Sequence, residues 1–146
     1  MGSARQSYFR LGGPRPRFLF VDDDTIAFRS LRRMLSSLRP HWRLVWEGDV
    51  GRGLELLLAE EFDVVVADVQ LLQLDNPVFF RVAERHSPHT RRVAHSVVRS
   101  SPRHLQCARS AQHLMLQPLD AGEFLLVLEN ALAECGPSSD SSAQAG

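Results

Sequence analysis

Lysine is missing from this sequence, in which all 17 basic residues are arginines. Without lysine, these 146 residues cannot form a Schiff base with a carbonyl substrate. They also cannot contain the phosphate-binding loop of the nucleotide hydrolases, because a lysine of that loop contacts the phosphates. Two large groups of enzymes are thereby excluded.

Cysteine and long apolar runs are also scarce. The two cysteines, Cys107 and Cys135, provide no disulfide framework and are typical of a reducing compartment. No apolar run reaches membrane-spanning length, and the N-terminus lacks the apolar core of a signal peptide. The formal net charge is zero, which indicates no general attraction to nucleic acid. We therefore expect a cytoplasmic protein that binds neither membrane nor nucleic acid.

The composition is that of one ordinary globular domain, with 44% apolar and 23% charged residues. Residues 1–16 are polar, contain several glycines and prolines, and predict a flexible leader. Residues 135–146 are rich in serine, alanine and glycine and predict a disordered tail or a linker. The folded domain is expected to span residues 17–134.

Strand-like and helix-like segments alternate through this domain. Short apolar runs, one of them β-branched through its middle, predict strands at 17–21, 43–47, 62–68, 92–96 and 113–117. Helical spacing of apolar residues predicts helices at 25–38, 50–60, 77–85, 102–109 and 121–134, with a loop at 69–76. This alternation predicts an α/β fold, a doubly wound five-stranded parallel sheet in a three-layer sandwich with a flavodoxin-like or Rossmann-like strand order. We expect the flavodoxin-like order.

Aspartates follow two of the predicted strands. Asp22, Asp23 and Asp24 end the first strand, and Asp68 ends the third. In the flavodoxin-like order these strands are neighbours, so their acids meet at one edge of the sheet. Adjacent carboxylates repel each other, and a hard divalent ion such as Mg²⁺ or Mn²⁺ would relieve the repulsion. The simpler alternative is that Asp23 or Asp24 only caps the following helix.

Four short motifs resemble the receiver domains of bacterial response regulators. In chain order they are FVDDD at 20–24, VVVAD at 64–68, AHS at 94–96 and QP at 117–118. The resemblance covers roughly residues 17–134, with all of the predicted elements in the family's order. It implies a signalling module of two-component systems rather than an enzyme.

The resemblance assigns roles to individual residues. In the family, a sensor histidine kinase or a phosphotransfer protein donates a phosphoryl group to an aspartate at the end of the third strand, here Asp68. A Mg²⁺ or Mn²⁺ ion is then implied at Asp22, Asp23 and Asp68, with the backbone carbonyl of Gln70 as a further ligand. Ser96 corresponds to the hydroxyl that turns toward the phosphoryl oxygens.

Two positions depart from the family's pattern. Gln117 stands where the family has a lysine, and Leu114 stands where an aromatic residue commonly partners the hydroxyl. Arg99, close to Ser96, is a candidate substitute for the lysine. These departures favour an alternative function, a degenerate receiver that acts as a protein–protein docking module without phosphorylation.

The aspartates after the first strand also resemble the nucleophile motif of haloacid-dehalogenase-type phosphatases, which would make the chain an enzyme. Its acids would be Asp22 and Asp24. Those enzymes require a lysine and a second acid pair late in the chain, and both are missing here.

The last predicted helix carries five consecutive apolar residues at 124–128, more than one buried stripe can absorb. We expect Phe124, Leu125, Leu128 and Leu132 to face inward and Leu126 to remain partly outside. In the receivers that the chain resembles, this region carries dimer and effector contacts. A homodimer or effector interface is therefore expected on the Leu114–Leu132 face.

Overall fold

The computed structural model describes residues 15–97, 102, 106, 108–117 and 120–134, without the side chains of Leu74, Val97 and Gln117. Most of the predicted leader, the predicted tail and half of the helix expected at 102–109 therefore lie outside the described residues. Among the helices that are described, none is long and apolar enough to cross a membrane.

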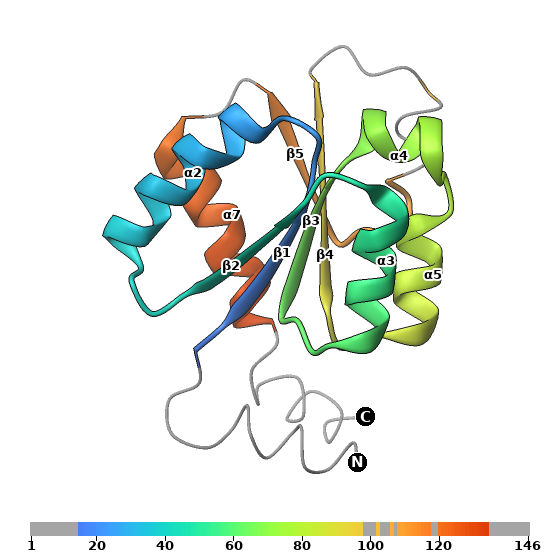
Figure 1. Cartoon of the computed structure of the whole chain (residues 1–146), viewed down its shortest axis with the longest axis horizontal. Coiled ribbons are helices and arrows are strands. Elements are labelled where there is room, and N and C mark those ends of the chain that lie inside the picture. Colours follow the sequence, from blue (N-terminus) through green and yellow to red (C-terminus); the bar gives the residue numbers. More distant parts are fainter. Residues whose placement is uncertain (1–14, 98–101, 103–105, 107, 118–119, 135–146) are drawn as a thin grey trace.

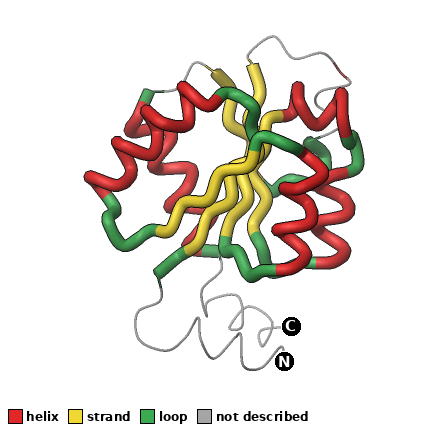
Figure 2. The backbone as a smooth tube through the Cα atoms, viewed as in Figure 1, coloured by secondary structure: helices red, strands yellow, loops and turns green. Residues whose placement is uncertain are grey.

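A five-stranded parallel sheet forms the centre of the molecule (Figures 1 and 2). Its order is β2-β1-β3-β4-β5, which confirms the predicted flavodoxin-like arrangement and makes β1 and β3 neighbours. The strands are β1 (Arg17–Val21), β2 (Arg43–Glu47), β3 (Val64–Asp68), β4 (Arg91–Val97) and β5 (His113–Gln117).

Helices cover both faces of this sheet (Figure 1). On one face lie α3 (Val50–Ala59), α4 (Val69–Asp75) and α5 (Phe79–His86). On the other face lie α2 (Thr25–Leu38) and α7 (Ala121–Ala133). The prediction of a loop at 69–76 was wrong, because α4 begins directly after β3 with Asp68 as its N-cap.

Alternation along the strands divides the apolar residues between two cores. In β1, Leu19 and Val21 face α3, whereas Phe18 and Phe20 face the side of α2 and α7. Both sets are buried, as expected for a central strand of a parallel sheet. The sheet therefore holds its strand ends in fixed positions.

Aspartates begin four of the described helices at the carboxyl edge of the sheet. Each accepts a hydrogen bond from a backbone N–H in the first turn of its helix. The caps are Asp24 for α2, Asp49 for α3, Asp68 for α4 and Asp120 for α7. Local helix capping thus concentrates carboxylates at the edge where α/β sheets place their ligands.

The last helix, α7, distributes its apolar residues as predicted. Leu128 is fully buried, while Phe124, Leu125 and Leu132 pack against the core more loosely. Leu126 is 57% exposed, which confirms that it points away from the core. Its exposure is compatible with the proposed interface but does not identify a partner.

Candidate functional site

The loop after β1 is fixed to β2 through the backbone of Asp22. The Asp22 N–H donates to the carbonyl oxygen of Glu47 (3.1 Å). The Trp46 Nε1–H donates to the carbonyl oxygen of Asp22 (2.7 Å). Gly48 makes room for this indole, because a Cβ there would lie 2.8 Å from the Trp46 ring. The position of the first acid is therefore set by β2 as well as by β1.

The three consecutive aspartates have different tasks. Asp24 Oδ1 accepts from the Ala27 N–H (3.0 Å) and caps α2. Asp22 Oδ1 accepts from the Asp24 N–H (2.9 Å), which turns the chain into that helix. The simple capping interpretation therefore holds for Asp24, whereas Asp23 is exposed and makes no cap.

Asp68 brings the third carboxylate from the end of β3. One oxygen from each of Asp22, Asp23 and Asp68 lies within 4.8 Å of the others. The convergence arises because β1 and β3 are parallel neighbours, with Val21 opposite Ala67 in the register. Asp68 Oδ1 also accepts from the Gln70 N–H (2.8 Å) as the N-cap of α4.

Burial and mutual repulsion act on the carboxyl group of Asp22. Desolvation is the largest cause, and together with the negative charges of Asp68, Asp23 and Asp24 it raises the pKa of Asp22 to about 6. The hydrogen bond from the Asp24 N–H opposes this increase. A bound cation would relieve both the desolvation and the repulsion, and three carboxylates are the hard oxygen ligands that Mg²⁺ prefers. The residues present therefore fit a divalent ion.

His95 lies beside this acid group and was missed from the sequence as a site residue. The β4 register places it opposite Asp68, so both side chains leave the sheet on the same face. Burial lowers the pKa of His95, and the negative charge of Asp68 opposes that shift. Its ring meets Phe124 of α7 edge-on, with centroids 6.1 Å apart. Strand alternation applied to residues 94–96 could have identified it.

Ser96 follows His95 and is buried. By alternation its side chain lies on the sheet face covered by α3, α4 and α5, opposite to the face of Asp68. Leu114 of β5, opposite Ala94 in the register, shares that face and is 43% exposed. The structure thus brings together the three predicted acids, whereas strand alternation directs Ser96 to the other face of the sheet.

Two further predicted residues cannot be placed in the site. Gln117 is the last residue of β5, opposite Val97 in the register, but its side chain is not described. Arg99, the candidate substitute for the lysine, lies outside the described residues. Within the described part of the chain, no ion pair includes Asp22, Asp23 or Asp68.

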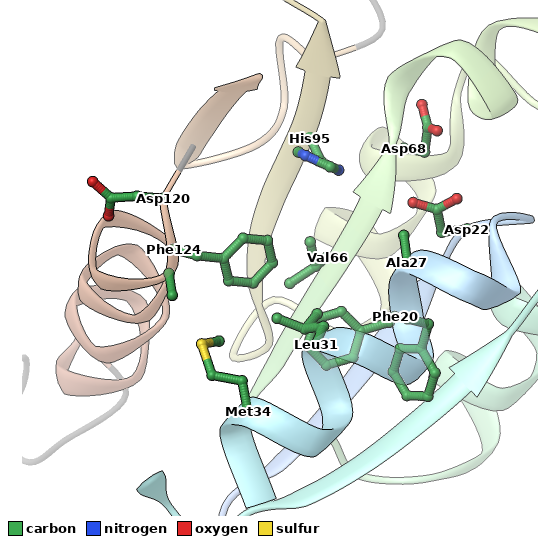
Figure 3. Close-up of a pocket in the computed structure, with 12 residues that line it drawn as sticks. Phe20, Asp22, Ala27, Leu31, Met34, Val66, Asp68, His95, Asp120 and Phe124 are labelled. Atoms are coloured by element: carbon green, nitrogen blue, oxygen red, sulfur yellow. The ribbon is translucent and has the colours of Figure 1, made fainter. Parts of the chain in front are cut away.

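A cavity adjoins the acid group on the face of α2 and α7. Figure 3 shows Asp22, Asp68 and His95 at one end and apolar side chains at the other. The sheet contributes Phe20 and Val66 to its lining. The apolar periodicity of the sequence predicted that these elements pack together, but it did not predict a space between them.

Comparison with known proteins gives a consistent result at the level of structure. No protein-family model matches the sequence, and no curated protein is detectably similar to it. Solved structures do match, however. The signal receiver domain of an HD domain-containing protein from Pseudomonas fluorescens Pf-5 is 26% identical, with a TM-score of 0.75 over 86% of this chain and 93% of that one.

Two other receiver domains match with similar coverage. A CheY-like response regulator receiver domain protein from Methanospirillum hungatei JF-1 is 20% identical, with a TM-score of 0.72 over 82% of this chain and 95% of that one. The receiver domain of the Francisella response regulator 1452 is 16% identical, with a TM-score of 0.69 over 83% of this chain and 99% of that one. The chain has the CheY-like fold of the response regulator receiver domains.

Proposed function

We propose that the chain is a receiver module of cytoplasmic two-component signalling, and that Asp68 accepts a phosphoryl group from the phosphohistidine of a sensor histidine kinase or a phosphotransfer protein. The observation that supports this most directly is the convergence of Asp22, Asp23 and Asp68 within 4.8 Å. The partly exposed carboxylates lie at the carboxyl edge of the sheet, where a donor can approach.

The hydrogen bonds of Asp68 indicate which oxygen reacts. Oδ1 accepts from the Gln70 N–H, whereas Oδ2 has no hydrogen-bond donor among the described residues. We infer that Oδ2 attacks phosphorus, so that a P–O bond forms as the P–N bond to the donor imidazole breaks. The imidazole leaves with the bonding electrons and takes up a proton from solvent. The product on Asp68 is an acyl phosphate.

Asp22, Asp23 and Asp68 would hold the divalent ion. When bound, Mg²⁺ or Mn²⁺ offsets the repulsion between the carboxylate and the incoming phosphoryl group. The remaining predicted ligand, the Gln70 carbonyl, lies in the first turn of α4. Carbonyls in a helix point toward its C-terminus, away from the acids, so Gln70 can contribute only if that turn opens.

The proposal can be tested with acetyl phosphate and MgCl₂ by measuring the intact mass of the protein. Asp68→Asn is the key variant, and Asp49→Asn is its matched control, because both aspartates cap helices and asparagine caps equally well. We expect the wild type and Asp49→Asn to gain one phosphoryl group. Asp68→Asn should gain none, and EDTA should prevent the gain in every protein.

The same experiment distinguishes the alternative function. Leu114 occupies the position where the family commonly has an aromatic residue, and the described residues provide no cation to the acids. Both observations favour a docking module that does not need phosphorylation. A wild type that remains unmodified at saturating acetyl phosphate, although it binds Mg²⁺, would support that alternative.

Restoring the family's pattern should accelerate the reaction. A preorganised donor to a developing charge contributes a factor of roughly 10²–10³ to a rate in other enzymes. We therefore expect Gln117→Lys to increase the rate of phosphoryl uptake from acetyl phosphate, and Leu114→Tyr to enlarge the conformational response. An unmodified chain that already reacts rapidly would mean that another group, with Arg99 the first candidate, replaces the lysine.

A further inference from the structure

The cavity between α2 and α7 has a volume of about 250 Å³ (Figure 3). Leu31 and Met34 of α2 form one wall, and Phe124 of α7 forms another. Phe20 and Val66 of the sheet form its floor. Most of the cavity is therefore an apolar container, built from both helices and from the two central strands.

The cavity exists because α2 covers the sheet loosely. Of the apolar residues of this helix, only Leu35 is fully buried. Phe28, Leu31 and Met34 pack against the core but remain partly exposed, and all three line the cavity. Apolar surface left in contact with water favours any ligand that can cover it.

The mouth of the cavity is negatively charged. Asp22 and Asp68 lie together at this end of the cavity (Figure 3), and none of the described residues in the lining is an arginine. Among the described residues, the charges that act on the carboxyl group of Asp22 are those of Asp68, Asp23 and Asp24. An apolar container with an acidic mouth is complementary to a molecule that has an apolar body and a cationic end.

We propose that this cavity binds a small organic cation, an ammonium or guanidinium group on an aromatic or branched aliphatic body. The cation would lie between Asp22 and Asp68, and the body would lie among Phe20, Leu31 and Phe124. The volume accommodates a molecule with a single ring, whereas a folded peptide segment is too large. This binding does not depend on the phosphoryl transfer proposed above, although the two would share Asp22 and Asp68.

Three probes with the same phenyl body separate charge from shape. They are 2-phenylethylammonium, the neutral 2-phenylethanol and the anionic 3-phenylpropanoate. Binding is measured by calorimetry and by amide chemical shifts, in EDTA and without a phosphoryl donor. We expect the ammonium to bind saturably and at least about tenfold more tightly than the alcohol, because its hydrogen bonds to carboxylates are charge-assisted. The anion should not bind.

Two pairs of variants locate the binding. Ala27 lines the cavity from the first turn of α2, so Ala27→Leu should obstruct it and abolish ammonium binding. Ser30→Leu, at an exposed position of the same helix, is its control and should bind normally. Asp22→Asn should lower the affinity for the ammonium about tenfold and leave the affinity for the alcohol unchanged. Asp49→Asn removes a capping charge that is not part of the cavity lining and should change the affinity for neither probe.

Circular dichroism first establishes that each variant is folded. Each of three results would overturn the proposal. They are equal affinities for the ammonium and the alcohol, undiminished ammonium binding in folded Ala27→Leu, and no saturable ammonium binding to the wild type. The phosphorylation assay is separate, so its failure would not affect this result. Conversely, a protein that takes up a phosphoryl group but ignores the ammonium would retain the proposed function and lose only the cavity ligand.

Discussion

The two faces of the sheet are packed differently. Under α3, α4 and α5, large side chains such as Phe79, Phe80 and Leu57 are fully buried. Gly53 of α3 lies so close to β1 that a Cβ would come within 2.8 Å of the Val21 side chain. Under α2 and α7, by contrast, a cavity separates the helices and several core residues remain partly exposed. We call these the closed face and the open face.

This difference assigns separate tasks to the two faces. The closed face holds the backbone of β1 and β3 against a dense layer and so fixes the spacing of their terminal acids. The open face leaves Asp22, Asp68 and His95 accessible from the side. A protein can thus keep a precise charge arrangement on a rigid support while leaving room for a ligand beside it.

Truncation of one phenylalanine on each face should give the largest contrast. Phe79→Ala removes a fully buried ring from the closed face and should decrease the free energy of unfolding by about 3–5 kcal/mol. Phe28→Ala removes a partly exposed ring beside the cavity and should cost less than half as much. Urea unfolding monitored by circular dichroism measures both. Equal losses would mean that the open face is as tightly packed as the closed one.

Two glycines of α3 test how closely this helix packs against β1 on the closed face. Gly53→Ala places a methyl group against the buried Val21 and should destabilise the protein by about 1–2 kcal/mol despite the higher helix propensity of alanine. Gly51→Ala should be nearly neutral, because the higher helix propensity of alanine is offset where the new methyl group approaches the capping oxygen of Asp49 at 3.3 Å. Equal losses in the two variants would contradict the close contact at Gly53.

The charged mouth of the open face should make stability depend on pH. Burial and the neighbouring carboxylates raise the folded pKa of Asp22 from the ordinary value of 3.8 to about 6, so the folded state binds this proton more tightly than the unfolded chain does. Stability should therefore fall as pH rises through about 6, by about 1 kcal/mol after allowance for solvent screening.

Asp22→Asn isolates that contribution. The wild type should become less stable relative to this variant between about pH 4 and 7 in metal-free buffer, as measured by urea unfolding at each pH. Burial lowers the pKa of His95, and this shift makes stability rise with pH, opposite to the effect of Asp22. Because both proteins contain His95, the difference between their profiles isolates the contribution of Asp22. Addition of Mg²⁺ should stabilise the wild type more than the variant. Parallel pH profiles would show that Asp22 does not carry the effect.

Filling the cavity should have the smallest effect on stability. Leu31→Phe adds apolar volume to the open face and should stabilise the protein by about 0.5–1 kcal/mol, as cavity-filling substitutions commonly do. Leu57→Phe, the equivalent substitution in the closed face, should destabilise by about 1–3 kcal/mol through overpacking. Thermal unfolding of the two variants compares them, and the opposite signs are the decisive result.

The sheet and the acid group could be predicted from sequence, whereas the helix α4 and the cavity of the open face could not. The alternation of elements indicates a doubly wound parallel sheet, and its flavodoxin-like order brings Asp22 and Asp68 together. The helix α4 was missed because its seven residues are followed by Asn76 and Pro77, which are typical of a turn. Asp68 is the N-cap of α4, but in the sequence alone an N-cap aspartate cannot be distinguished from an aspartate in a loop.

The cavity depends on how far α2 and α7 lie from the sheet, and the apolar periodicity of the sequence does not predict that distance. Leu31, Met34 and Phe124 have ordinary helical spacing, which predicts burial but not its completeness. To predict that His95 lies beside Asp68, one needs the pairing register of β3 and β4, in which these two residues are opposite each other. Sequence therefore predicted which residues face inward, while tertiary packing decided how much space they leave.

The hydrogen bond between the Trp46 indole and the carbonyl oxygen of Asp22 gives the molecule a built-in optical reporter. Indole emission responds to its polar surroundings, and any ion or ligand that shifts the Asp22 loop must change this contact. The only other tryptophan, Trp42, stacks on Phe18 at the opposite edge of the sheet and adds its own emission to the signal. A Trp42→Phe protein would therefore report events at the acids through a single fluorophore, with no added label.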